Sequence, residues 1–98
     1  MSRNEKLTQI IAGRTVSNIR SKPSETAIHF DDGSMLQIQG KPVGDHAQAA
    51  SKKIAAVRED HDALHLDFHD GEELQLRVSD PGGSVVLRDA SNKIEYAG

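Results

Sequence analysis

Hydrophobic and polar residues alternate over positions 64–78, with one interruption in the middle of this stretch. The apolar residues take every second position on either side of the interruption: Leu64, Leu66, Phe68, Leu74, Leu76 and Val78. A period of two is typical of strands that bury one face. The interruption contains Asp70 and Gly71, a pair that suits the positive φ values of a type I′ turn. The pattern predicts an antiparallel hairpin.

The same pattern occurs earlier in the chain. Residues 16–38 align with residues 54–76 without a gap, at a shift of 38 positions. The identical pairs are Arg20/Arg58, Phe30/Phe68, Asp32/Asp70, Gly33/Gly71, Leu36/Leu74 and Gln37/Gln75. An internal repeat of this kind predicts two similar structural units.

One break in the alternation occurs in both copies. Val16 and Ile19 are three positions apart, and so are Ile54 and Val57. A strict strand pattern would separate apolar residues by two positions. The shared break therefore predicts a β-bulge or a bent strand at each place.

Two short helices are also expected. Ser2 and Glu5 fit a capping box, an apolar stripe follows at residues 7, 10 and 11, and Gly13 suits the end of the helix. A second, Ala-rich helix is expected from Asp45 to Lys53.

The fold expected from these patterns is α+β and mostly antiparallel β, in a single domain of residues 1–98. Two tandem 38-residue (α)βββ repeats, at about 2–40 and 41–78, would be related by a pseudo-twofold axis. A C-terminal hairpin at 84–96 lies outside the repeat. A three-stranded sheet with one wet face is not stable alone, so the two units should pack their apolar faces or join edges. Phe30 and Phe68 would then lie near the centre of the core.

Composition narrows the possible functions. The net charge is −3, Lys and Arg are scattered, and only 3% of residues are aromatic, so nucleic-acid binding is not expected. The absence of Cys excludes disulfides and thiolate metal sites. No long apolar run or hydrophobic signal region occurs, which predicts a cytoplasmic protein without membrane association.

Two sets of residues are candidate sites. His65, Asp67 and His69 would share one strand face, and imidazole and carboxylate are ligands for zinc and other divalent metals. The alternative is an ordinary solvent-facing strand. Arg20 and Arg58 either pair with an Asp at a hairpin tip or bind an anionic ligand.

No constellation of residues points to catalysis. The carboxylates at the hairpin tips are explained by turn formation, and no nucleophile has identifiable partners. We therefore expect a protein that is not an enzyme and needs no cofactor.

The segments F-D-D-G-S-M-L (30–36) and F-H-D-G-E-E-L (68–74) share the pattern F-x-D-G-x-x-L. This pattern resembles hairpin modules of short uncharacterised bacterial and phage proteins. The resemblance implies a bacterial or phage source and, as one alternative, an inhibitor of a bacterial defence system. The function expected from the residues is binding of a protein partner, or of a second copy in a homodimer, through a sheet face or edge. The other alternative is a small-ligand or divalent-metal binding protein that uses the candidate sites above.

Overall fold

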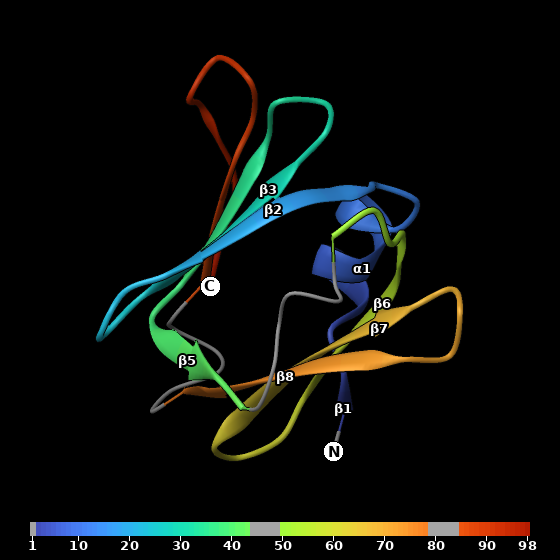
Figure 1. Ribbon diagram of the computed structural model, residues 1–98, viewed down its shortest axis with the longest axis vertical. Helices are drawn as coiled ribbons and strands as arrows, with labels where there is room; N and C mark the ends of the chain where they lie inside the picture. The colour runs from blue at the N-terminus through green and yellow to red at the C-terminus, as the bar shows by residue number, and fades with distance from the viewer. Residues whose placement is uncertain (1, 44–49, 79–84) are drawn as a thin grey trace.

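The computed structural model describes residues 2–43, 50–78 and 85–98 (Figure 1). Along the chain, its elements are β1 (Ser2–Arg3), α1 (Glu5–Ile11), β2 (Val16–Ser21), β3 (Thr26–Phe30), β4 (Met35–Ile38), β5 (Gly40–Pro42), β6 (Ile54–Glu59), β7 (Ala63–Phe68), β8 (Glu73–Val78), β9 (Val85–Arg88) and β10 (Ile94–Ala97).

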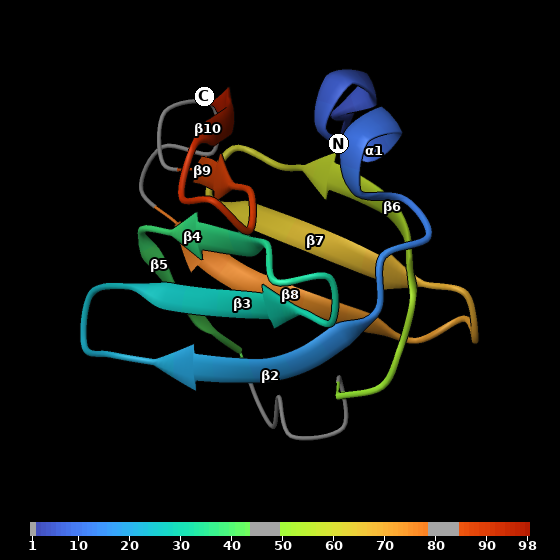
Figure 2. The same cartoon turned by 90° about the horizontal axis from the view of Figure 1, so that it is seen from above.

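These strands form two five-stranded sheets that lie in separate layers (Figure 2). One sheet has the order β1-β6-β7-β8-β5 and the other has the order β10-β9-β4-β3-β2. All strand pairs are antiparallel. The predicted class of fold, mostly antiparallel β, is confirmed, and the C-terminal hairpin is present as β9 and β10. The internal repeat and its symmetry axis remain predictions.

The two halves of the chain exchange strands. β5 follows β4 after one residue but pairs with β8 of the other sheet, while β9 pairs with β4. Gly40 is required at the crossing, because a Cβ there would lie 2.4 Å from the backbone oxygen of Arg77. Thr26 Oγ1 also donates a hydrogen bond of 2.8 Å to the Gly40 carbonyl. Each sheet therefore contains strands from both halves, which the sequence pattern did not predict.

The core lies between the sheets. It takes its side chains from the strands of both sheets and from α1, and it includes Phe30 and Phe68, which are 3% and 4% exposed. Leu7 and Ile11 anchor the helix in this core. Packing of two apolar faces, one of the two expected arrangements, is the one observed.

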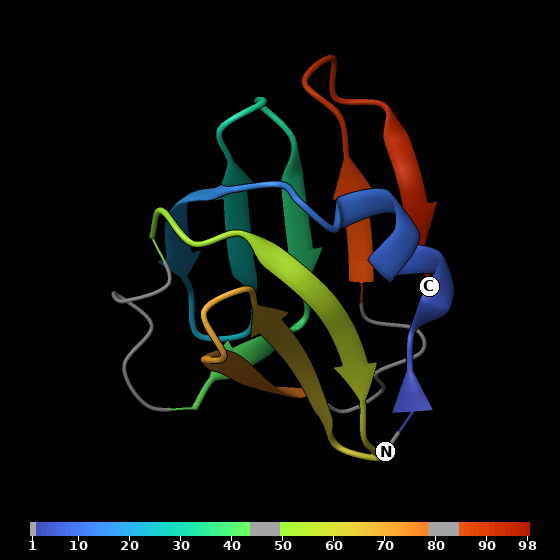
Figure 3. The same ribbon diagram turned by 90° about the vertical axis from the view of Figure 1, so that its right-hand side faces the viewer.

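α1 lies at one end of the two layers, beside β6 and the C-terminal strand (Figure 3). Its N-cap is Asn4, whose Oδ1 accepts a 3.0 Å hydrogen bond from the Leu7 backbone. The capping box predicted from Ser2 is wrong, because Ser2 belongs to β1 and pairs with Glu59. Gly13 follows the helix with φ +90°, as its position predicted. No helix within the described ranges is long and apolar enough to cross a membrane.

The second predicted helix can be checked only in part. Residues 45–49 lie outside the described residues. From Ala50 the chain makes a turn, and Lys53 forms a β-bridge with Thr15. A helix that extends to Lys53 is therefore wrong, because the backbone there forms a β-bridge with Thr15, just before β2.

The hairpin turns differ from the predicted type. Gly33 and Gly71 have φ +90° and +89°, but the Asp before each is not among the described residues with positive φ. The Gly33 amide donates to the Phe30 carbonyl at 3.1 Å, and the Phe30 amide donates to the Ser34 carbonyl at 2.9 Å. This is a three-residue loop, a type I turn followed by a left-handed glycine, and the type I′ assignment is wrong. The Asp side chain instead caps the loop, since Asp32 Oδ1 accepts from the Ser34 amide at 2.8 Å.

The predicted irregularities near the start of each unit are present. The pairing register shifts between Val16 and Asn18 in β2, and between Ile54 and Ala56 in β6. A β-bulge, rather than a smooth bend alone, therefore explains the three-residue spacing of the apolar positions.

Candidate functional site: the outer faces of the two sheets

Outward-facing residues form a matching cross-strand row in each of the two sheets. In one sheet, Arg20 of β2 lies opposite Ala27 of β3, which lies opposite Gln37 of β4. In the other sheet, Arg58 of β6 lies opposite His65 of β7, which lies opposite Gln75 of β8. The two rows differ only at the central residue, Ala27 in one and His65 in the other. This is one of the differences between the two faces.

The row around Arg58 satisfies its charge within the chain. Arg58 Nε and Nη2 donate to the two carboxylate oxygens of Asp67 at 2.6 and 2.7 Å, and Nη2 also donates to Glu73 Oε2 at 2.9 Å. A two-pronged contact of this kind is the strongest that a guanidinium makes with a carboxylate. The hydrogen bond to Asp67, more than any other cause, raises the pKa of Arg58 above its ordinary value.

His65 fills the centre of the same face. The whole residue is 6% exposed, and the imidazole Nδ1 lies 2.9 Å from Glu73 Oε2. Its Nε2 is buried and has no hydrogen-bond partner within the part of the chain that the structure describes. Glu73 thus contacts both the imidazole of His65 and the guanidinium of Arg58. The ionisable side chains at the centre of this face therefore pair with one another.

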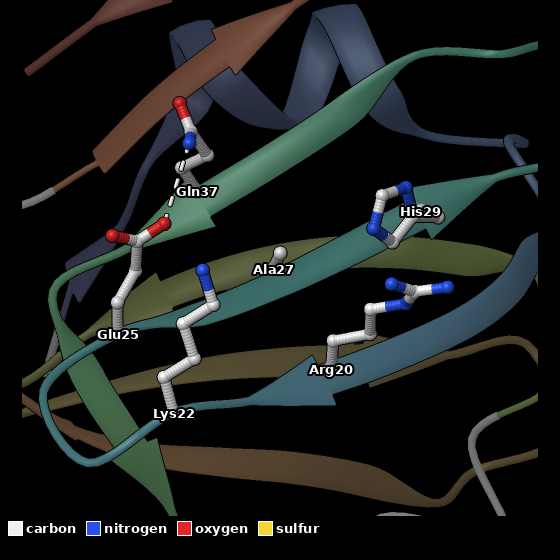
Figure 4. Close-up of a pocket in the computed structure, with 6 residues that line it drawn as sticks. All are labelled: Arg20, Lys22, Glu25, Ala27, His29 and Gln37. Atoms are coloured by element: carbon white, nitrogen blue, oxygen red, sulfur yellow. Dashed lines mark hydrogen bonds between the residues drawn. The ribbon is translucent and has the colours of Figure 1, made fainter.

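The row around Arg20 instead surrounds a hollow of about 210 Å³, lined by Arg20, Lys22, Glu25, Ala27, His29 and Gln37 (Figure 4). Ala27 lies among the longer side chains of the lining, and its own side chain ends at Cβ. The hollow therefore exists because a small residue occupies the central strand where the other sheet has a histidine.

The charges of this hollow are only partly balanced. Gln37 Nε2 donates to Glu25 Oε1 at 3.3 Å, and Gln37 Oε1 accepts from Arg88 Nε at 3.1 Å. The side chains of Arg20, Lys22 and His29 have no hydrogen bond or ion pair with the rest of the described chain. Arg20 is exposed. The face therefore presents cationic groups that are available to another molecule.

The two candidate arginines do not form one site, since Arg20 is on β2 and Arg58 is on β6 of the other sheet. Pairing with a hairpin-tip Asp is also not what Arg58 does, because its carboxylate partners are Asp67 and Glu73 on β7 and β8. Asp67 and Glu73 thus engage the Arg58 guanidinium within the chain. Anion binding by Arg20 stays a prediction.

The hairpin-tip aspartates pair with other cations. Asp32 lies 3.5 Å from Arg14, and Asp70 lies 3.0 Å from Lys52. Sequence analysis missed this pairing, although Arg14 and Lys52 are themselves 38 positions apart. Extending the alignment a few residues towards the N-terminus would have found it.

The proposed metal ligands gain no support from their arrangement. Both carboxylate oxygens of Asp67 bind Arg58, and His65 is buried against Glu73, while His69 is exposed. Among the residues that the structure describes, no three His, Cys, Asp or Glu side chains form a group that could hold a metal ion.

Comparison of the chain with protein-family models, with curated proteins and with solved structures finds no match in any of the three.

Proposed function

We propose that this protein is a non-enzymatic binding module, and that the face formed by β2, β3 and β4 binds an acidic surface of a protein partner. One observation supports this most directly. Arg20, Lys22 and His29 line the hollow, and none of their side chains has an acid partner among the described residues. Cationic groups left in this state favour association with a complementary negative surface and steer its approach.

The contrast with the other sheet strengthens the proposal. There, Arg58 has Asp67 and Glu73 as carboxylate partners, whereas Arg20, at the corresponding position, has no carboxylate partner among the described residues. A folded chain that can neutralise an arginine in this register, and does so in one sheet, leaves the other arginine available. The proposed binding face is therefore the one that carries the available arginine.

The sign of the charge also indicates which kind of partner binds. In a symmetric dimer the same patch meets itself. Two copies of a face bearing Arg20 and Lys22 would place like charges together, which costs free energy. We therefore favour a different, acidic protein over self-association through this face.

The test compares two double variants with equal changes in charge. In R20E/K22E the proposed face is reversed. In K41E/R77E the change falls on the other sheet, where Lys41 and Arg77 are exposed cross-strand neighbours. Proteins retained by the wild-type chain from an extract of its source organism would be identified, purified and titrated by calorimetry against all three chains.

We expect R20E/K22E to weaken the binding of a purified partner by at least about tenfold, a loss of about 1.4 kcal/mol. The K41E/R77E control should bind within about twofold of the wild type. Equal losses in both variants would mean that only overall charge matters, and no loss in R20E/K22E would place the interface elsewhere. Either result overturns the proposal.

A further inference from the structure

We infer that the hollow above Ala27 receives one carboxylate side chain, an Asp or Glu of the partner, which the guanidinium of Arg20 holds. This inference rests on the proposed function and specifies the chemistry of the contact. It is argued from the counterpart in the other sheet, from the size of the hollow and from its charge.

The other sheet shows what an arginine in this register binds. Arg58 takes the carboxylate of Asp67 with two hydrogen bonds, and a third goes to Glu73. At 38 positions before these two acids the chain has His29 and Met35, which are not carboxylates. Arg20 therefore lacks the internal acids that Arg58 has, and the partner would supply one.

The space needed for such a side chain is also present. His65 fills the centre of the other face, whereas Ala27 leaves a hollow of about 210 Å³ beside Arg20. Sites for small organic ligands usually enclose roughly 300–1,000 Å³. The smaller volume suits a single inserted side chain better than a whole small-molecule ligand.

The charge of the lining matches one carboxylate. Arg20 and Lys22 contribute two positive charges and Glu25 one negative charge, which leaves +1 from these three side chains. Glu25 is held by Gln37, which in turn is held by Arg88, so Glu25 does not occupy the guanidinium of Arg20. A single carboxylate balances the remaining charge, whereas a doubly charged phosphate would exceed it.

The test is a titration followed by NMR of the ¹⁵N-labelled full chain. The probe is N-acetyl-glutamate α-methylamide, whose only charge is the side-chain carboxylate, and the matched control probe is the glutamine analogue. We expect saturable shifts centred on the Ala27 amide and the Arg20 Nε–H with the glutamate probe. The glutamine analogue should produce none at the same concentrations.

Variants separate the space from the charge. Ala27→Leu fills the hollow without changing charge, and Arg20→Gln removes the charge with a similar side-chain length. Each variant should bind the glutamate probe at least about tenfold more weakly than the wild type does. Arg77→Gln, on the other sheet, should bind within about twofold of the wild type. Unchanged resonances from the core in every variant show that the fold is intact.

Three outcomes would overturn the inference. These are shifts spread over all exposed cations, an unaltered titration in Ala27→Leu, and tighter binding of inorganic phosphate than of the glutamate probe. The last result would assign the hollow to a phosphorylated group instead. If the probe does not bind but R20E/K22E still loses the purified partner, the inference fails while the proposed function stands. If neither variant nor probe has an effect, both fail.

Discussion

Replacing Glu73 with Ala should destabilise the protein far more than its exposure suggests. The Glu73 side chain is 47% exposed, which by itself would indicate a minor surface residue. It nevertheless joins two other groups, because one of its oxygens, Oε2, lies 2.9 Å from both Arg58 Nη2 and His65 Nδ1. The two contacts carry very different free energies.

The ion pair with Arg58 contributes little. Half-exposed pairs of this kind contribute roughly 0.2–1 kcal/mol. The contact with His65 contributes more, because the imidazole is only 7% exposed and its other nitrogen already lacks a partner among the residues described. Leaving a buried polar group without its hydrogen bond costs about 1–3 kcal/mol. Together the two losses predict a decrease of about 2 kcal/mol in the free energy of unfolding, or about 10 °C in Tm for a chain of this length.

The assay is chemical denaturation of four chains: wild type, Glu73→Ala, His65→Leu and the double variant. In the His65→Leu background, Glu73→Ala should cost under about 1 kcal/mol, because only the ion pair with Arg58 is left to lose. The coupling between the two sites should therefore be about 1–2 kcal/mol. Glu72→Ala, a neighbouring exposed glutamate with no side-chain partner among the described residues, is the control and should change stability by less than about 0.5 kcal/mol. A loss for Glu73→Ala no larger than that of the control would refute the argument.

Three further predictions follow from the fold. Phe68→Ala, at a side chain 4% exposed in the core, should cost about 3–5 kcal/mol in chemical denaturation, and a loss well below 1 kcal/mol would contradict the assigned core. Gly33→Ala should cost more than Gly71→Ala by Tm: both have φ near +90°, but only at Gly33 would the new Cβ meet Ala90 Cβ, at 3.0 Å, and equal losses would mean that the contact relaxes freely. The pKa of Asp32 lies below its ordinary value, chiefly through a side-chain hydrogen bond from the serine two residues along, so its contribution is present above the unfolded pKa of about 3.9 and is lost as the pH falls through the lower folded value. Asp32→Asn should therefore be less stable than the wild type at pH 6, by under about 1 kcal/mol because the side chain is 48% exposed, and the difference should shrink as the pH falls below about 3.9. A difference that does not shrink on acidification would exclude this ionisation as its source.

Local patterns predicted most of the strands because a strand with one buried face has apolar residues at every second position. This alternation occurs in β3, β4, β7 and β8, and their core-facing residues are buried. The bulges were also predictable, since an extra residue displaces the next apolar position by one.

Features that depend on pairing between distant segments were not predictable in this way. β1 and β5 have two and three residues, too few to show a period, and each exists because a strand of the other half binds it. Asn4 displaced Ser2 as the helix cap because Ser2 pairs with β6. Tertiary contacts overrode local preference at each of these places.

The hollow shows the same limit for function. In the alternating pattern Ala27 is only a small residue on an outward-facing position, and nothing in the sequence next to it indicates a site. Its effect emerges when the register places it between Arg20 and Gln37 on neighbouring strands. The sequence was enough to name candidate residues. It was not enough to predict which of them other side chains of the same chain would bind.

The two arginines explain why matched residues need not share a role. Arg20 and Arg58 occur in the same pairing register, yet Arg58 has two carboxylate partners and Arg20 has none among the described residues. The difference lies in the neighbours. Asp67 and Glu73 hold Arg58, whereas the chain has His29 and Met35 at the positions 38 residues earlier. Ala27, where the other sheet has a histidine, also leaves the space beside Arg20 unfilled. If the proposed site is correct, filling the space beside Arg20 should weaken binding without a change to either arginine. The proposed site therefore depends on a small residue as much as on a charged one.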